Sequence, residues 1–236
     1  MNGLIKSVAL ATGMLGLATS ASAIIIDDYN GPAESFNTSV LAPPTQTVTD
    51  GGTATGGNVL GGTRTLGFRV VENDGSTSPS GVIDIDAADT NILGFQSAAN
   101  TRIAGIVSYS GGALAPGFDL TADGSDAFRL DILQNNVAIP FRLTLDDGVI
   151  SETVNVNIPG AVLNFPVDIA FTDFVNVDLT SIVGITTEFD ASTTIFGVAL
   201  EADAFQTVDT TPAAVPAPAA ALLMIAGLFG LRRARK

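Results

Sequence analysis

The chain has 236 residues, a formal net charge of −14, and neither Cys nor His. The missing Cys and His exclude disulfides, thiol chemistry and the usual zinc sites. An acidic surface repels phosphate backbones, so nucleic acid is excluded as a partner.

The N-terminal segment has the features of a secretory signal peptide. Lys6 gives it a charged start, and residues 8–18 form an apolar stretch too short to span a membrane. Ala21 and Ala23 place small residues at the two positions that a signal peptidase reads. We therefore expect residues 1–23 to be removed by signal peptidase after Ala23. The alternative is an uncleaved amphipathic start.

Residues 24–209 are predicted to form a single domain. This segment holds all 24 acidic residues but only five basic ones, all arginines, which leaves a formal charge of −19. Its first part, residues 27–62, is rich in Gly, Thr, Pro and Asn and predicts an entry strand followed by long loops. The length is sufficient for a sizeable core.

From residue 63 onward, apolar and polar residues alternate in short runs. A period of two with apolar residues on one face is typical of half-buried strands. Asp146, Asp147 and Gly148 separate two such runs and predict a tight hairpin. A single helical turn is possible at 87–93. The residues that share the apolar face of each run are Ile83 and Ile85; Phe128, Leu130 and Ile132; Phe141, Leu143 and Leu145; Val154, Val156 and Ile158; and Ile185 and Phe189, with Thr187 between them on the same face.

Many short strands separated by Gly and Asp turns predict an all-β fold, a single antiparallel β-sandwich of jelly-roll form with about nine strands. Three segments resemble exported jelly-roll domains related to carbohydrate-binding modules. They are Ile-Asp-Asp-Tyr at 26–29, Leu-Gly-Gly-Thr-Arg at 60–64 and Val-Ala-Leu-Glu-Ala-Asp at 198–203. The resemblance implies that the first and last strands lie close together.

The C-terminal segment 210–236 combines an uncharged run with a basic end. No charged residue occurs from Thr210 to Leu231, and a stretch of this length can cross a bilayer as a helix. A basic cluster directly after it favours retention of that end on the cytoplasmic side. We therefore expect a transmembrane helix with the domain outside the cytoplasm. The basic residues are Arg232, Arg233, Arg235 and Lys236.

A short motif precedes the apolar run: Val215, Pro216, Ala217, Pro218 and Ala219. Motif, apolar run and basic end together resemble the PEP-CTERM class of bacterial sorting signals, in the variant built on Val-Pro-Leu-Pro-Ala (VPLPA-CTERM), with Ala217 in place of Leu. The resemblance implies that an exosortase-type membrane enzyme cuts the tail and passes the protein to the cell surface or extracellular matrix. The alternative is a plain single-span membrane anchor.

The residue types of the domain argue against catalysis. Without His, Cys or Lys between residues 24 and 209, the common nucleophile–base pairs cannot form. Paired carboxylates could still hydrolyse glycosidic bonds, but there is no Trp, and only Tyr29 and Tyr109 could join phenylalanines in gripping a sugar ring. We therefore expect no enzymatic activity and rank a glycoside-active enzyme last.

Calcium is a candidate cofactor because hard cations take several carboxylate and carbonyl oxygens. The carbohydrate-binding-module resemblance implies that the entering strand meets the last strand, which makes Asp28, Glu201 and Asp203 candidate ligands for a structural Ca²⁺. Further acidic clusters lie at 84–89 and 119–126. The simpler alternative for each cluster is a solubilising role at strand ends.

Arginines are the candidates for polar contact with a ligand. Arg64, Arg102 and Arg142 could each hydrogen-bond a sugar or a uronate carboxylate, although pairing with nearby carboxylates is the simpler role. The sequence therefore predicts an exported, acidic protein of the cell envelope or extracellular matrix with a structural or adhesive role. The alternative is a calcium-stabilised carbohydrate-binding module with an extracellular polysaccharide as its partner.

Overall fold

The computed structural model describes residues 23–30, 34–38, 46–50, 59–73, 81–85, 91–99, 101–194 and 196–211. Residues 1–22 of the predicted signal peptide lie outside this part, as do the sorting motif, most of the apolar run and the basic end at 212–236. Among the described residues, no helix is long and apolar enough to cross a membrane.

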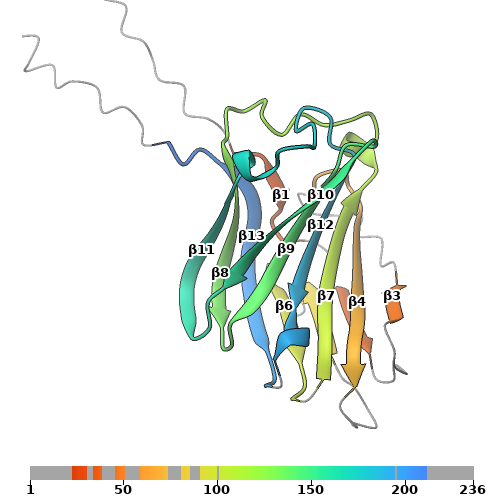
Figure 1. The fold of residues 1–236 in the computed structure, drawn as a ribbon, viewed down its shortest axis with the longest axis vertical. Coiled ribbons are helices and arrows are strands. Elements are labelled where there is room, and N and C mark those ends of the chain that lie inside the picture. Colours follow the sequence, from red (N-terminus) through yellow and green to blue (C-terminus); the bar gives the residue numbers. More distant parts are fainter. Residues whose placement is uncertain are drawn as a thin grey trace, which may run out of the picture.

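Thirteen strands in the described residues form two antiparallel sheets (Figure 1). The seven-stranded sheet consists of β1 (Ile25–Asp27), β2 (Glu34–Thr38), β5 (Gly81–Ile85), β6 (Leu93–Ser97), β8 (Ala127–Asn135), β11 (Val162–Ala170) and β13 (Ala199–Val208). The six-stranded sheet consists of β3 (Gln46–Asp50), β4 (Arg64–Asn73), β7 (Thr101–Ser110), β9 (Ile139–Asp146), β10 (Ser151–Ile158) and β12 (Gly184–Asp190). Three short 3₁₀ turns join them: η1 (Gly112–Leu114), η2 (Phe171–Asp173) and η3 (Ala191–Thr193).

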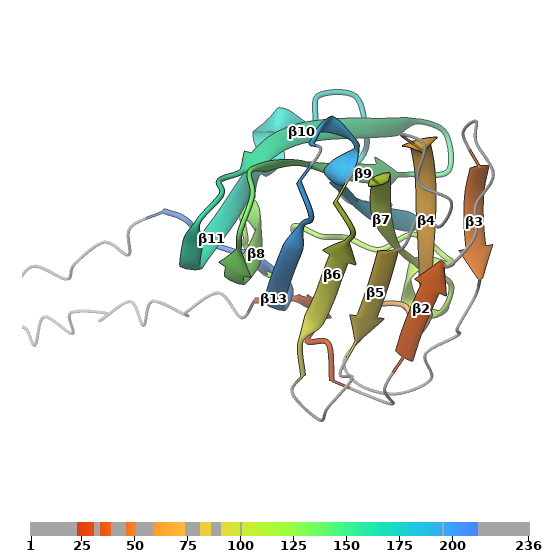
Figure 2. The same cartoon turned by 90° about the horizontal axis from the view of Figure 1, so that it is seen from below.

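The two sheets pack face to face as the layers of a sandwich (Figure 2). The first has the order β11-β8-β13-β6-β5-β2 with β1 beside β13, and the second has the order β10-β9-β12-β7-β4-β3. The predicted all-β, antiparallel sandwich is therefore confirmed. The expected strand number was too low, partly because β2 and β3 lie within residues 27–62, where only an entry strand was expected. Their sequences, Glu-Ser-Phe-Asn-Thr and Gln-Thr-Val-Thr-Asp, have too few apolar residues to show a clear period of two.

The predicted alternation places most apolar residues in the core between the sheets. Phe95 of β6 packs between Phe68 of β4 and Phe189 of β12, with ring centroids 6.4 and 6.1 Å apart. A Cβ atom on Gly105 of β7 would lie 2.7 Å from the Phe95 ring, so this position needs glycine. The possible helical turn at 87–93 is wrong at its end, because Leu93 begins β6; residues 86–90 lie outside the described part.

The hairpin between β9 and β10 forms where the sequence predicts it. Gly148 has a φ of +83°, a backbone conformation that glycine adopts without strain. Asp146 Oδ1 accepts the Gly148 N–H at 2.8 Å, and the Asp147 N–H donates to the Ile150 carbonyl at 3.1 Å. This turn fixes the register of β10 against β9, which later determines which polar side chains become neighbours.

A buried ion pair joins the end of β1 to the start of β4. Strand β1 itself pairs with β13, as the resemblance implies. Arg64 Nη1 lies 2.8 and 2.9 Å from the two carboxylate oxygens of Asp27, and both side chains are fully buried. Burial raises the pKa of Asp27 above its ordinary value, and the Arg64 guanidinium offsets part of the rise. Tyr29 and Tyr109 are also buried, which raises the pKa of each phenol. Arg64 thus has the simpler of its two expected roles, pairing with a carboxylate, and neither Arg64 nor the two tyrosines is available to a sugar.

Candidate functional site

The outer face of the six-stranded sheet carries a row of hydroxyl groups. Strand register aligns one Ser or Thr from each of five adjacent strands, β10, β9, β12, β7 and β4. Two hydrogen bonds join members of the row, Thr144 to Thr153 at 2.8 Å and Ser108 to Thr186 at 3.2 Å. Adjacent strands lie about 4.8 Å apart, so the hydroxyls repeat at that spacing. We call this set the hydroxyl row: Thr153, Thr144, Thr186, Ser108 and Thr65.

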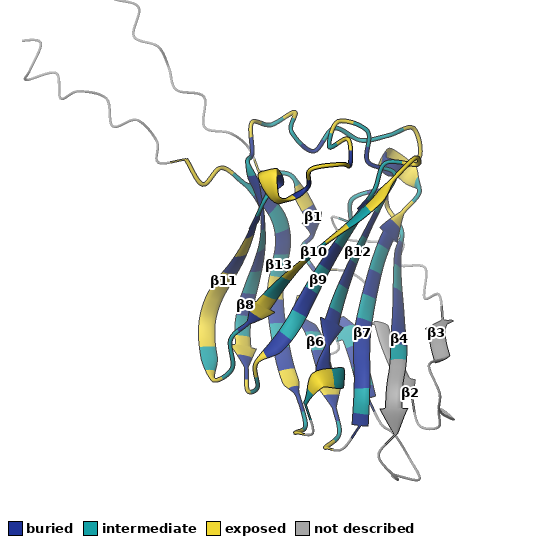
Figure 3. Ribbon diagram, in the orientation of Figure 1, coloured by how far each residue is buried: buried dark blue, intermediate teal, exposed yellow. Residues whose placement is uncertain are grey.

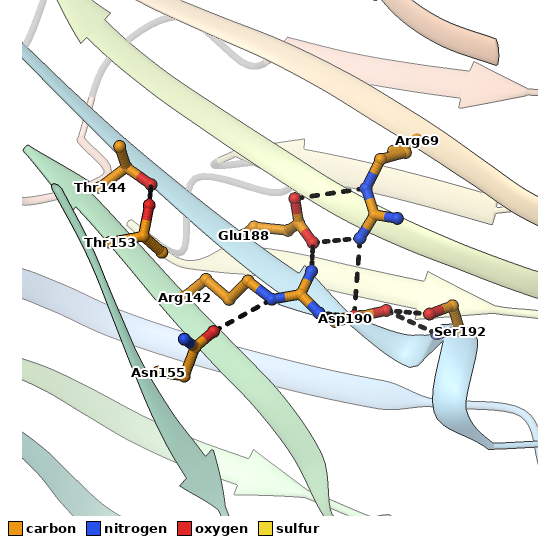
Figure 4. A network of polar contacts seen from close by, with 8 residues as sticks. All are labelled: Arg69, Arg142, Thr144, Thr153, Asn155, Glu188, Asp190 and Ser192. Atoms are coloured by element: carbon orange, nitrogen blue, oxygen red, sulfur yellow. Dashed lines mark hydrogen bonds and ion pairs between the residues drawn. The ribbon is translucent and has the colours of Figure 1, made fainter. Parts of the chain in front are cut away.

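Beside the hydroxyl row, a single carboxylate holds two guanidinium groups (Figure 4). Glu188 of β12 accepts hydrogen bonds from Arg69 of β4 and Arg142 of β9. Arg142 Nε also donates to Asn155 Oδ1 on β10 at 3.1 Å. The Glu188 hydrogen bonds raise the pKa of Arg69 further above its ordinary value, although partial burial opposes the rise. Side chains from four strands are thus joined across the face.

A second carboxylate completes this arginine network. Asp190 Oδ2 lies 2.6 Å from Arg142 Nη2 and 3.5 Å from Arg69 Nη2. Asp190 also caps η3 by accepting the Ser192 N–H at 3.0 Å, so its position is fixed by the backbone. Only 2% of the Asp190 side chain is exposed, whereas Arg69 and Arg142 keep 28% and 32% of theirs exposed. The carboxylates therefore hold the guanidinium groups of two side chains that remain partly exposed to solvent.

These groups give the face a defined chemistry. Planar guanidinium groups present several N–H donors in a fixed fork, and hydroxyls both donate and accept. Buried residues alternate with more exposed ones along these strands (Figure 3). Among the described residues the exposed face has no aromatic ring, because the aromatic side chains of these strands are buried. An arrangement of this kind suits a ligand rich in hydroxyl groups. The buried aromatic residues are Phe68, Tyr109, Phe141 and Phe189.

The structure does not gather the candidate calcium ligands into a cluster. Asp28 follows β1, where its carboxylate accepts the Asn30 N–H at 3.1 Å. Glu201 of β13 lies opposite Gly94, beside Asp84 of β5, and Asp203 is exposed on the same strand as Glu201. Across the described part of the chain, no group of three or more acidic side chains is placed to hold a metal ion. Calcium binding stays a prediction.

Sequence reasoning found only part of the polar face. Of its three named arginines, Arg142 lies in the network, Arg64 is buried and Arg102 is half-buried on β7. It missed Arg69 as a site residue. Alternation does place Thr186 and Glu188 opposite the apolar side of β12, and this pattern could have indicated that both residues lie on the outer face of the sheet. The ion pair between Arg69 and Glu188 could not be predicted from the sequence, because the two residues are 119 positions apart.

No protein-family model matches the chain, and no curated protein matches it. Several solved structures are similar at low identity. One is the family 11 carbohydrate-binding module from Clostridium thermocellum in complex with a β-1,3-1,4-mixed-linked tetrasaccharide, at 12% identity and a TM-score of 0.40, covering 81% of this chain and 98% of that one. Another is CBM28, a module specific for non-crystalline cellulose, at 14% identity and a TM-score of 0.34, covering 60% and 86%. At such distances the ligands of these proteins do not define a ligand for this chain.

Proposed function

We propose that the protein is an exported carbohydrate-binding β-sandwich that binds a neutral, hydroxyl-rich polysaccharide on the outer face of its six-stranded sheet. The observation that carries this proposal is the arginine network beside the hydroxyl row. Glu188 and Asp190 hold Arg69 and Arg142 in place before any ligand arrives. Side chains that are already ordered lose little conformational entropy on binding, so more of the free energy of each hydrogen bond contributes to affinity.

The charges favour a neutral glycan over a uronate-rich one. Two carboxylates already balance the two guanidinium groups, so the network offers no surplus positive charge. The surrounding domain carries five arginines against 24 acidic residues, and this negative field repels polyanions. Sugar hydroxyls need only hydrogen bonds, which the network and the hydroxyl row both supply.

The affinity is expected to be modest. Without an aromatic platform on the described part of the face, stacking on sugar rings does not contribute there. Hydrogen bonds alone, each offset by lost water contacts, support dissociation constants on the order of 0.1–1 mM. Such values suit repeated binding along a polysaccharide in a matrix, where many weak contacts add up.

The test compares two exposed arginines on opposite sheets. Arg142→Ala removes a guanidinium from the proposed face, and Arg129→Ala removes one of matching exposure, 34% against 32%, from the outer face of the other sheet. Binding of a mixed-linked β-glucan and of alginate is measured by affinity electrophoresis and calorimetry. We expect the β-glucan to bind and alginate not to, with Arg142→Ala weakening binding at least about tenfold and Arg129→Ala leaving it unchanged.

Two outcomes would overturn the proposal. Equal loss in both variants would place the ligand elsewhere, and absence of glycan binding in the unaltered protein would return the structural or adhesive role to first place. Export through the signal peptide, tail processing by an exosortase-type enzyme and the lack of enzymatic activity remain predictions beside this proposal.

A further inference from the structure

The residue that follows the predicted cleavage site is held by its backbone nitrogen. The Ile24 N–H points at two acceptors, Asp123 Oδ2 at 3.1 Å and Thr207 Oγ1 at 2.8 Å. Thr207 is fully buried in β13, and its own N–H donates to the Ile24 carbonyl at 2.9 Å. The start of the predicted mature chain thus lies in a polar cradle at the edge of the core.

This cradle is built around the Asp123 carboxylate. Oδ1 accepts the Ser125 N–H at 2.9 Å, and Oδ2 accepts the hydroxyls of Ser125 and Thr207 at 2.8 and 2.9 Å. Gly124 has a φ of +84°, which allows the tight turn in which Ser125 donates to the Asp123 carboxylate. Partial burial raises the pKa of Asp123, but the hydrogen bonds from Ser125, Thr207 and Ile24 outweigh it, so the pKa lies below its ordinary value. The group is therefore anionic at neutral pH.

We propose that this cradle is a binding site for a primary ammonium, the α-ammonium that signal peptidase creates on Ile24. Hydrolysis of the Ala23–Ile24 peptide bond leaves a carboxylate on Ala23 and an amine on Ile24, which takes up a proton. The amide has one hydrogen for two acceptors, whereas the ammonium has three. It can donate separately to Asp123 and Thr207, and a charge-assisted bond to a carboxylate is shorter and stronger than a neutral one.

The consequence concerns the entry of the chain into the sandwich. β1 pairs with β13 over only a short register, Ile25 with Gln206 and Asp27 with Phe205 (Figure 1). An ion pair at Ile24 fastens the start of β1 to β13, and Asp27 fastens its end through the buried pair with Arg64. Removal of the leader thus adds a contact that the precursor lacks. This inference rests on cleavage after Ala23 and is independent of glycan binding.

The composition of the chain provides a direct assay. Lys6 and Lys236 are the only lysines, so a chain that begins at Ile24 has two amines, the α-amine and Lys236. The full chain is produced with its own leader in a bacterial host, extracted in detergent, and its N-terminus is read by mass spectrometry. An acetylating reagent is then applied at pH 8. At this pH an ordinary α-amine is more than half deprotonated, so a carboxylate partner that raises its pKa by about one unit lowers its free fraction about fivefold.

Two variants give the comparison. Asp123→Asn removes the anion, and insertion of Ile-Ser between Ala23 and Ile24 keeps an N-terminal Ile but moves the ammonium away from an intact cradle. We expect Ile24 to be acetylated about fivefold more slowly in the unaltered chain than the α-amine of either variant, with Lys236 reacting equally in all three. The melting temperature should fall with Asp123→Asn in the unaltered background and much less in the insertion background.

Three outcomes of these measurements would overturn the proposal. It is overturned if the three α-amines react at the same rate, because the ammonium is then not held. It is also overturned if Asp123→Asn lowers the melting temperature equally in both backgrounds, because Asp123 then acts only within its own turn. It is overturned as well if mass spectrometry finds the N-terminus at another residue, because Ile24 then carries no α-ammonium for the cradle to bind. Glycan binding is measured on the same samples and separates these outcomes from failure of the proposed function.

Discussion

Two clusters of arginine and carboxylate use the same chemistry in opposite surroundings. Arg64 and Asp27 form a fully buried pair in the core under β1. Arg69 and Arg142 pair with Glu188 and Asp190 on the outer face of the six-stranded sheet, where 28% and 32% of the two arginine side chains stay exposed.

The difference shows what each cluster can do. A buried charge loses its water and depends wholly on its partner, so the core pair fixes the fold and offers nothing to a ligand. The surface network has a smaller desolvation cost, because its arginine side chains remain partly exposed to solvent. The same residue types thus help to position a strand in one place and form the proposed recognition surface in the other.

The largest effect is expected from breaking the buried pair. Arg64→Met leaves the Asp27 carboxylate buried without its guanidinium, which should lower the free energy of unfolding by about 3–5 kcal/mol in urea titrations at pH 7. The double variant Asp27→Leu with Arg64→Met removes the stranded charge and should recover much of that loss. If the single variant unfolds at the same urea concentration as the unaltered protein, the two clusters do not differ as described.

A smaller effect is expected from the surface network. Glu188→Gln keeps the shape of the side chain but removes the charge shared by Arg69 and Arg142. Because these arginines are partly solvated, the free energy of unfolding should fall by only about 1 kcal/mol. Glycan affinity should nevertheless fall at least about tenfold, since the arginines lose their fixed positions. A stability loss as large as that of Arg64→Met would contradict the contrast between the clusters.

The exposed pair on the opposite sheet should matter least for stability. Arg129 donates two hydrogen bonds to Asp168, at 2.7 and 2.8 Å, with both side chains more than one-third exposed. Solvent screens such a pair, so Arg129→Met should change the free energy of unfolding by less than about 1 kcal/mol. The urea midpoint in low and high salt provides the measurement, and a loss of several kcal/mol would show that exposure does not govern these pairs.

Two surface carboxylates that accept backbone N–H groups of the loop at 176–178 give a local, pH-dependent effect. Glu152 accepts the Asn176 and Val177 N–H groups at 2.8 and 3.1 Å, and Asp147 accepts the Asp178 N–H at 2.9 Å. These bonds hold the pKa of each carboxyl below its ordinary value. Their stabilisation is present above the unfolded pKa of about 4 and is lost as the pH falls through the lower folded value.

Amide hydrogen exchange checks this expectation. Exchange at Asn176, Val177 and Asp178, corrected for its intrinsic pH dependence, should be unchanged between pH 7 and 5 and faster below about pH 4. Amides in the centre of β8 provide the reference, because they are held by main-chain bonds on both sides. Loss of protection already at pH 6 would mean that other groups hold this loop.

The sequence predicts which face of each strand is buried better than it predicts which strands lie side by side. The alternation of Phe128, Leu130 and Ile132 identifies a strand and its buried face, and the structure confirms both. Alternation carries no information about which strands become neighbours, so the pairing of Glu188 with Arg69 was hidden. Pairing with a carboxylate was the simpler role expected for Arg64, but the sequence did not identify its partner Asp27, which lies 37 positions away, or predict that both side chains are fully buried.

The position of β13 has a mechanical consequence. β13 lies inside the seven-stranded sheet, antiparallel to β1, β6 and β8, and the chain leaves the sandwich from its end (Figure 1). A pull on the C-terminal end acts along the axis of this strand, so its hydrogen bonds are loaded together in shear rather than opened one after another. A protein tethered to a cell by its tail would therefore carry tension through a strand that pairs with three neighbours, and forced unfolding should be slow.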